Sequence, residues 1–264
     1  MDLELRGKAA FVSGGSKGIG LAVARAFAAE GADVAIGARN GDTVEKEADR
    51  IKSDFGVAAC GIMMHATKNG DILSARDLIV ERLGGIDILV NNAGTGSEET
   101  IMGADDEKWY RFWDLHVMAA IRTARAFVPI MRERGGGVIL NTASICASQP
   151  LWYEPIYNTT KAALVMLSKC LANELIADNI RVNTVNPGLV MTPDWRKTAG
   201  ILGKKEGISA DEYLDRVARE NAPIGRFSTP EEVAHLYAFL ASPRASYCAG
   251  STYYIDGGWL KVTT

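Results

Sequence analysis

The chain has 264 residues, of which 47% are apolar and 23% charged, and its formal net charge is −3. This length is enough to bury one sizeable core, so we expect a single domain over residues 1–264. The small negative charge gives no attraction to phosphate backbones or anionic lipid, and no apolar run approaches the roughly 20 residues of a membrane span, so neither nucleic acid nor a membrane is an expected partner. The scattered cysteines and isolated histidines predict reduced thiols, a cytoplasmic location and no metal site.

Short apolar or β-branched runs alternate along the chain with longer segments of helical periodicity. The expected strands are Ala9–Ser13, Val34–Gly37, Val57–Met63, Ile86–Asn91, Val138–Thr142, Arg181–Val185 and Thr252–Ile255. The expected helices are Ile19–Glu30, Thr43–Phe55, Asp71–Leu83, Asp105–Arg134, Tyr157–Ala177 and Pro230–Leu240. This alternation predicts an α/β fold with a parallel sheet. The one long departure, at about 192–222, predicts a loop that covers the substrate as a lid, with a short helix at Asp211–Glu220.

A glycine-rich turn follows the first expected strand, in the segment Ser13–Gly20, and a helix of small residues comes directly after it. Gly14 suits a tight turn, Gly18 a close approach of the backbone to a pyrophosphate, and Gly20 close packing of helix on strand. The positive end of the helix would face the phosphates. The segment therefore predicts a dinucleotide site.

The end of the second expected strand indicates which nicotinamide cofactor binds. An acid there would accept hydrogen bonds from the adenosine ribose and favour NADH, but the strand is followed by Arg39. Arg39 can bind a 2′-phosphate through charge-assisted hydrogen bonds, and Lys17 of the glycine turn is a second candidate cation for the same phosphate. We therefore expect NADP(H) in preference to NAD(H), which stays open as an alternative.

Three side chains in the middle of the chain can together move a proton to or from a carbonyl oxygen. Tyr157 and Lys161 are four residues apart, so on a helix they share one face, and the ammonium can favour the phenolate. Ser144, thirteen positions before Tyr157, adds a hydroxyl. A phenol with a pKa near ~10 is a poor base at neutral pH unless a cation stabilises its ionised form.

With these motifs in order, the sequence resembles the short-chain dehydrogenase/reductase superfamily over nearly its whole length, in the compact single-domain form of about 250 residues. The segments that carry the resemblance are Ser13–Gly20, Asn91–Gly94, Ser144 with Tyr157 and Lys161, and the Asn186-Pro187-Gly188 turn with Thr192.

The resemblance implies a Rossmann-type doubly wound domain, with a seven-stranded sheet in the order 3-2-1-4-5-6-7, and hydride transfer to or from a carbonyl carbon. In that reaction Tyr157 donates the proton, Lys161 lowers the pKa of Tyr157 and binds the nicotinamide ribose, and Ser144 orients the carbonyl. The further cofactor contacts implied are Ser13, Ser16, Ile19, Asn40, Asn91, Ala93, Gly94, Pro187, Gly188, Val190 and Thr192.

Two positions depart from the family pattern. His116 stands where the family usually has an asparagine that links the lysine to solvent through water, so it either relays protons, with a pKa near ~6.5 that adds pH sensitivity, or merely packs. His65 and Ala66 stand where Asp-Val often lies near the adenine, and we expect both beside the adenosine.

The substrate walls expected from sequence are Ser144, Ile145, Trp152, Tyr153 and Trp195. Together these features predict an NADPH-dependent carbonyl reductase that runs in reverse as an alcohol dehydrogenase, acting on a small molecule. Three alternatives remain: a 3-oxoacyl-thioester reductase, a lyase that has lost the nucleotide site, and a nucleotide-binding sensor without catalysis. The family resemblance further implies a homotetramer, although periodicity alone does not distinguish it from a dimer.

Overall fold

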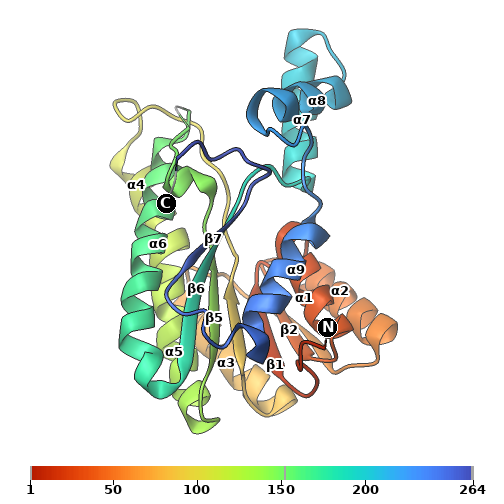
Figure 1. Cartoon of the computed structure of the whole chain (residues 1–264), viewed down its shortest axis with the longest axis vertical. Coiled ribbons are helices and arrows are strands. Elements are labelled where there is room, and N and C mark those ends of the chain that lie inside the picture. The colour runs from red at the N-terminus through yellow and green to blue at the C-terminus, as the bar shows by residue number, and fades with distance from the viewer. Residues whose placement is uncertain (1, 152, 263–264) are drawn as a thin grey trace.

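A seven-stranded parallel sheet forms the centre of the molecule (Figure 1), in a computed structural model that describes residues 2–151 and 153–262. Its strand order is β3-β2-β1-β4-β5-β6-β7, which confirms the expected Rossmann-type order. Every neighbouring pair of strands is parallel. The strands are β1 (Ala9–Ser13), β2 (Asp33–Ala38), β3 (Ala59–Met63), β4 (Ile88–Asn91), β5 (Gly137–Thr142), β6 (Ile180–Pro187) and β7 (Thr252–Ile255).

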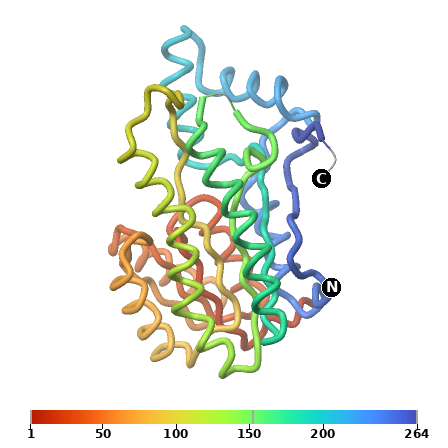
Figure 2. Tube along the Cα trace, turned by 90° about the vertical axis from the view of Figure 1, so that its left-hand side faces the viewer, coloured from red at the N-terminus to blue at the C-terminus, as the bar shows by residue number. Residues whose placement is uncertain are grey.

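Helices cover both faces of this sheet (Figures 1 and 2). One face carries α1 (Gly18–Ala29), α2 (Gly41–Phe55) and α9 (Pro230–Ala241). The other carries α3 (Asn69–Leu83), α5 (Ala119–Glu133) and α6 (Pro155–Leu175). In the part of the chain that the structure describes, no helix is both long enough and apolar enough to cross a membrane.

The strands read as nearly continuous apolar runs because both of their faces are buried. Along β1, Phe11 points into the core on the α3, α5 and α6 side, whereas Val12 points into the core beneath α1 and α9. Phe11 packs there against Phe127 of α5, with ring centroids 5.3 Å apart. This two-sided burial fixes the positions of the strand ends, where the glycine turn and the other motifs lie.

The expected single helix Asp105–Arg134 is wrong in one respect, because the structure divides it. It consists of α4 (Asp106–Trp113), a π-helical turn (Asp114–Met118) and α5. The π turn carries His116. Such turns insert one extra residue into a helix and are frequent at functional sites, and the periodicity of apolar residues gives little sign of them.

The segment 192–222 contains two helices, of which α8 (Ala210–Asn221) confirms the short helix expected at Asp211–Glu220. Helix α7 (Pro193–Glu206) lies where a loop was expected. The side chain of Thr192 accepts a hydrogen bond from the Trp195 amide, and Pro193 occupies the first turn of α7. Two glycines inside α7 hide its periodicity in the sequence. In Figure 1 the two helices project together beyond one end of the sheet.

Candidate active site

The predicted motifs meet at the carboxyl ends of the strands, where β1 and β4 are neighbours although they are not consecutive in the chain. Ligands of doubly wound sheets bind at such a switch point. The turn after β1, the loop after β4, the residues after β5 and the turn after β6 all lie at this edge. It is therefore the natural position of a cofactor and a substrate.

The glycine turn has the backbone that the motif requires. Gly14 and Gly18 have φ values of 68° and 57°, in the left-handed region that favours glycine. A Cβ at Gly20 would lie 2.3 Å from the carbonyl oxygen of Gly14, so a larger residue there would disrupt the turn. The turn thus brings the amino end of α1 to the edge of the sheet with its backbone amides accessible.

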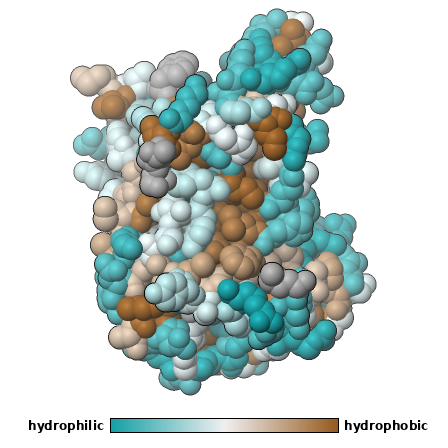
Figure 3. All heavy atoms as spheres, viewed as in Figure 1, coloured by the Kyte–Doolittle hydropathy of each residue, from teal (hydrophilic) through white to brown (hydrophobic). Residues whose placement is uncertain are grey.

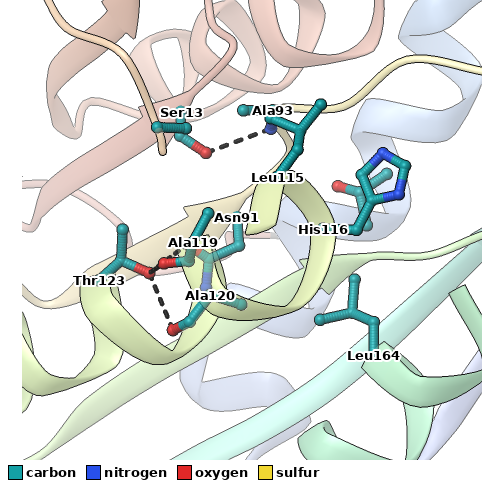
Figure 4. A pocket seen from close by; sticks show the side chains of 11 residues that line it. Ser13, Asn91, Ala93, Leu115, His116, Ala119, Ala120, Thr123 and Leu164 are labelled. Carbon is teal, nitrogen blue, oxygen red and sulfur yellow. Dashed lines mark hydrogen bonds between the residues drawn. The ribbon is translucent and has the colours of Figure 1, made fainter. Parts of the chain in front are cut away.

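Hydrogen bonds join this turn to the loop after β4. The Ser13 hydroxyl accepts hydrogen bonds from the amides of Asn92 and Ala93, at 3.1 and 3.2 Å. The Asn92 side chain donates in return to the carbonyls of Ser13 and Gly14. Figure 4 shows the link between Ser13 and Ala93 above the π turn. Ser13 therefore shapes the site, and Asn92 is a structural residue that the sequence analysis did not single out.

The Asn91 side chain makes its hydrogen bonds within the protein. Its amide nitrogen donates to Asn141 at 2.8 Å, and its carbonyl oxygen accepts a hydrogen bond from Thr123 at 2.7 Å. The side chain is buried and ties β4 to β5 and α5. The backbone of Ala93 and Gly94, which follows, is the part of the motif at the site.

The residues expected near the adenosine end are spread along the same edge. Arg39 is exposed directly after β2, and Asn40 caps α2 by accepting a hydrogen bond from the Thr43 amide. His65 hydrogen-bonds to the Asp71 carboxylate through its ring and its amide, and Ala66 lines a small cavity beside the loop after β4.

Lys17 has a protein partner that the sequence did not reveal. Its ammonium lies 2.6 Å from the carboxylate of Asp194, in the first turn of α7, and both side chains are more than half exposed. Thr192 lies close to the glycine turn as well, because a Cβ atom added to Gly18 would be 3.4 Å from the Thr192 methyl group. The start of α7 thus touches the glycine turn. An exposed ion pair is weak, so a phosphate can compete with Asp194 for Lys17.

The turn after β6 positions the remaining predicted contacts. Gly188 lies against β7, since a Cβ there would be 2.8 Å from the Asp256 Cα atom, and Val190 is buried. Close packing therefore already requires the glycine. From Pro187 the chain runs along this edge to Thr192 at the start of α7.

The structure brings Ser144, Tyr157 and Lys161 together. Ser144 is buried after β5, and its hydroxyl accepts a hydrogen bond from the Cys146 amide at 3.2 Å. The Lys161 ammonium lies 5.4 Å from the centre of the Tyr157 ring and donates to the Thr142 carbonyl at 2.8 Å. Because Tyr157 lies in the first turn of α6 and Lys161 one turn later, their side chains share one face.

Burial shifts the pKa values of Tyr157 and Lys161 in a way that their spacing in the sequence did not predict. Burial, together with the nearby Cys146 and Glu154, raises the pKa of Tyr157, and a hydrogen bond with Ser144 only partly opposes this. Burial also lowers the pKa of Lys161 to about 8. In the protein alone the pKa of Tyr157 is therefore raised overall, and the expected lowering by Lys161 stays a prediction. The phenol stays protonated at neutral pH, ready to donate.

His116 is a neutral, buried connector. Its Nε2 accepts a hydrogen bond from the Thr95 amide at 3.4 Å, so Nδ1 carries the proton and donates to Thr160 at 2.8 Å. The Thr160 hydroxyl in turn donates to the backbone carbonyl of Tyr157. Burial and the Lys161 charge lower the pKa of His116 to about 2, which contradicts the expected pH sensitivity.

Two further observations place His116 within the site. Its ring packs edge-on against Tyr157, with centroids 5.5 Å apart. It also lines a cavity of about 10 Å³ with Leu115 and Ala119 (Figure 4). That volume is at the lower limit for one water molecule.

Replacing His116 by asparagine should lower kcat about tenfold, because one buried hydrogen bond to Thr95 or Thr160 is lost. The shape of the pH profile between pH 5.5 and 8 should not change, because the imidazole is neutral throughout that range. Steady-state rates across pH measure both effects, with His235→Asn, at an exposed position of α9, as the control. A wild-type acid limb that vanishes in the variant would show that His116 titrates.

Glu154 is a site residue that the sequence analysis missed. It is buried at the start of α6, with one carboxylate oxygen 3.5 Å from the Cys146 sulfur and the other beside Gly96. Burial, aided by the charge of Glu99, raises its pKa to about 7. An acid immediately before the proline that begins the Tyr157 helix was the available signal.

Only some of the residues expected to line the substrate site lie together in the structure. Ile145 and Tyr157 belong to an apolar cluster with α7 and α8, and Tyr153 is partly buried near Glu154. Trp195 packs edge-on against Phe227, with centroids 5.2 Å apart, so its ring holds α7 against the segment before α9. Trp152 lies outside the described residues.

Comparison with known proteins identifies the chemistry. A family model described as enoyl-(acyl carrier protein) reductase matches residues 14–260. Galactitol 2-dehydrogenase of Agrobacterium fabrum is 34% identical, over 98% of this chain and 100% of its own. Dehydrogenase/reductase SDR family member 4 of Oryctolagus cuniculus is 36% identical, over 96% of this chain and 94% of its own.

A solved structure is more similar still. L-sorbose reductase from Gluconobacter frateurii, complexed with NADPH and L-sorbose, is 54% identical, with a TM-score of 0.98 over 100% of both chains. The motifs, the strand order and these similarities agree, and the chain belongs to the short-chain dehydrogenase/reductase family of oxidoreductases.

Proposed function

We propose that this oxidoreductase uses NADPH to reduce the carbonyl group of a small polyhydroxylated substrate to an alcohol, and that it runs in reverse as a polyol dehydrogenase. The observation that carries the proposal is the half-buried, protonated Tyr157 beside the buried Ser144 and Lys161, at the edge where the glycine turn lies. The likeness to L-sorbose reductase and galactitol 2-dehydrogenase supports the substrate class.

The residues present fit a dinucleotide. Gly14 and Gly18 give the turn its left-handed backbone, and the Gly20 position leaves no room for a side chain between turn and helix. Ser16, Ile19 and the amides at the start of α1 would hold the pyrophosphate. Arg39, with Lys17 once it leaves Asp194, would hold a 2′-phosphate.

Side chains of the protein would transfer the proton to the substrate oxygen and stabilise the charges that form. When bound, NADPH supplies the hydride that reduces the carbonyl carbon. Ser144 accepts a hydrogen bond from the Cys146 amide, and its hydroxyl hydrogen, which faces Tyr157, would donate to the carbonyl oxygen of a bound substrate. Tyr157 would donate the proton as that oxygen gains negative charge, and the Lys161 ammonium would stabilise the phenolate left behind.

Glu154 supports a polar substrate, although the aromatic side chains expected at the substrate site would also suit a fairly apolar ketone. A buried carboxylate needs hydrogen-bond donors, and Glu154 contacts the Cys146 thiol, a weak donor, and the Ser97 amide. A carboxylate can accept more hydrogen bonds than these two, so a substrate hydroxyl next to the carbonyl carbon would be a further donor. This acid is also close enough to raise the pKa of both Tyr157 and Lys161, which places it beside the reacting group.

A substrate panel followed by NADPH absorbance tests the proposal. Ketoses such as L-sorbose should be reduced faster than apolar ketones or acetoacetyl-CoA, and the reaction with NADH should be slower. Faster turnover of the thioester would favour the 3-oxoacyl-thioester reductase. Tight NADPH binding with no turnover of any carbonyl would favour a sensor.

Arg39→Ala should weaken NADPH binding about tenfold or more and leave NADH binding nearly unchanged, because a charge-assisted contact to the 2′-phosphate contributes roughly 1.5–3 kcal/mol. Fluorescence titration of each cofactor measures the two dissociation constants. Lys46→Ala, a change at another exposed cation on the adjacent α2, is the control. Equal losses for NADPH and NADH would overturn the role of Arg39.

We also propose a homotetramer, and two exposed apolar faces support it. Figure 3 shows apolar side chains gathered around β7 and α9, where Leu236, Tyr253 and Ile255 are only partly buried. On the opposite side of the sheet, Met166 of α6 and Trp113 of α4 are 65% and 43% exposed. Burial of these faces against copies of the chain would remove apolar surface from water.

A further inference from the structure

The helix that carries Tyr157 lacks a cap from its own sequence. Glu154 occupies the N-cap position of α6, and its side chain makes no capping hydrogen bond. The first amides of a helix have no partner within it, so they need acceptors from elsewhere. Tyr157 lies in this first turn, which is the part of a helix that frays most readily.

The loop after β4 supplies the missing acceptors from about sixty residues away in sequence. The Glu99 carboxylate accepts a hydrogen bond from the Ile156 amide at 3.1 Å. The Ser97 hydroxyl accepts one from the Tyr157 amide at 3.3 Å and donates to the same Glu99 oxygen at 3.0 Å. The Glu99 amide donates to the carbonyl of Tyr153, so the loop and the start of α6 are joined in both directions.

The Glu99 carboxylate is held in its charged form. Its other oxygen lies 2.8 Å from the Lys108 ammonium, and the Glu99 side chain is only 5% exposed. Burial works against ionisation, but Lys108, the Ile156 amide and Ser97 together lower the pKa of Glu99. Lys108 belongs to α4, which runs directly into the π turn of His116. Glu99 therefore connects the elements on both sides of Tyr157.

From these contacts we infer that Glu99 is a positioning residue, whose carboxylate caps α6 across the loop and fixes the Tyr157 hydroxyl relative to Ser144. The inference rests on the proposed proton-donor role of Tyr157. A charged acceptor at a helix start is stronger than a neutral cap and also interacts favourably with the helix dipole. Proton transfer depends on sub-ångström placement, so movement of this first turn would slow turnover with little effect on cofactor binding.

Glu99 also affects the substrate-facing acid. Its negative charge raises the pKa of Glu154, while the Lys161 charge opposes this, and Cys146 and the Ser97 amide also contact Glu154. Removing the Glu99 charge should therefore move the Glu154 titration to lower pH. A residue with a purely structural role would not produce this shift.

Three variants test the inference. Glu99→Ala removes both capping and charge and should lower kcat about 10- to 100-fold, with the dissociation constant of NADPH unchanged. Glu99→Gln keeps an oxygen that can accept from the Ile156 amide, so most of kcat should return, while the acid limb of kcat/KM moves to lower pH. The matched control is Glu98→Ala, because the adjacent Glu98 contacts Lys108 through its backbone carbonyl, which the substitution keeps.

Each outcome has a defined meaning. Wild-type kcat in a folded Glu99→Ala variant, or a loss in Glu98→Ala as large as that in Glu99→Ala, would overturn the inference. If Glu99→Ala does not fold, Glu99→Gln decides: near-normal kcat with a shifted acid limb supports the inference, and an unshifted limb refutes it. Failure of the proposed function is separate, because it would appear as turnover in Tyr157→Phe.

Discussion

Replacing Tyr157 by phenylalanine should lower kcat for carbonyl reduction by about a thousandfold, because general acid catalysis contributes roughly 10²- to 10⁴-fold and Tyr157 is the proposed proton donor. The buried phenol is protonated at neutral pH, so the variant loses the proton that the alkoxide needs. NADPH binding should change little, since the ring remains in place against His116.

The measurement is single-turnover hydride transfer from NADPH, followed by absorbance, beside a fluorescence titration of the cofactor. Tyr110→Phe is the matched control, because Tyr110 is 65% exposed on α4, away from the buried group. Unchanged turnover in Tyr157→Phe would refute the mechanism. Loss of cofactor binding with loss of turnover would show instead that the hydroxyl serves to hold the cofactor.

The direction of the reaction should depend on pH through the same group. Oxidation of an alcohol needs Tyr157 as a base, and burial raises the pKa of Tyr157, so oxidation should accelerate as pH rises. Reduction uses the protonated form, which is already present at neutral pH. The initial rate of oxidation should therefore rise with pH more steeply than that of reduction.

Most of the fold was predictable because each strand is buried on both faces, so its sequence is a nearly continuous apolar run. The structure places β1 and β7 at the expected bounds, Ala9–Ser13 and Thr252–Ile255. The π turn was not predictable, because one inserted residue shifts a helix face without changing its composition. Helix α7 was missed although Thr192-Pro193 is the same start signal that correctly marked α9 at Thr229-Pro230.

In the candidate site, too, local features were predictable and contacts between distant segments were not. Tyr157 and Lys161 could be paired from sequence because they are four residues apart on one helix, and the glycine turn is local as well. The contacts of Glu99 and His116 join segments far apart in the chain, so nothing in the sequence places them. The raised pKa of Tyr157 was also beyond prediction, because it arises from burial and from the nearby Cys146 and Glu154, which the spacing of Tyr157 and Lys161 does not reveal.

Glu154→Gln should lower kcat/KM for a ketose about 10- to 100-fold, the size expected when a charged hydrogen bond to a substrate hydroxyl becomes neutral. Reduction of an apolar ketone, which offers no hydroxyl, should change little and serves as the internal control. The wild-type kcat/KM for the ketose should fall as pH drops below about 7, because the pKa of Glu154 is about 7 and only the ionised carboxylate is a full acceptor. That acid limb should be absent in Glu154→Gln.

The same substitution should stabilise the protein at alkaline pH, because the buried carboxylate is costly when ionised. An acid whose pKa is raised in the folded state contributes stability below its unfolded pKa of about 4.5, and this contribution is lost as pH rises through about 7. Glu154→Gln removes the ionisation, so its Tm at pH 8 should exceed that of the wild type, while the two converge near pH 4. A higher Tm with lower ketose turnover would show that Glu154 is kept for the substrate at the expense of stability. Wild-type ketose turnover in the variant would refute the proposed substrate contact, and an unchanged Tm at pH 8 would show that the carboxylate is not destabilised by burial.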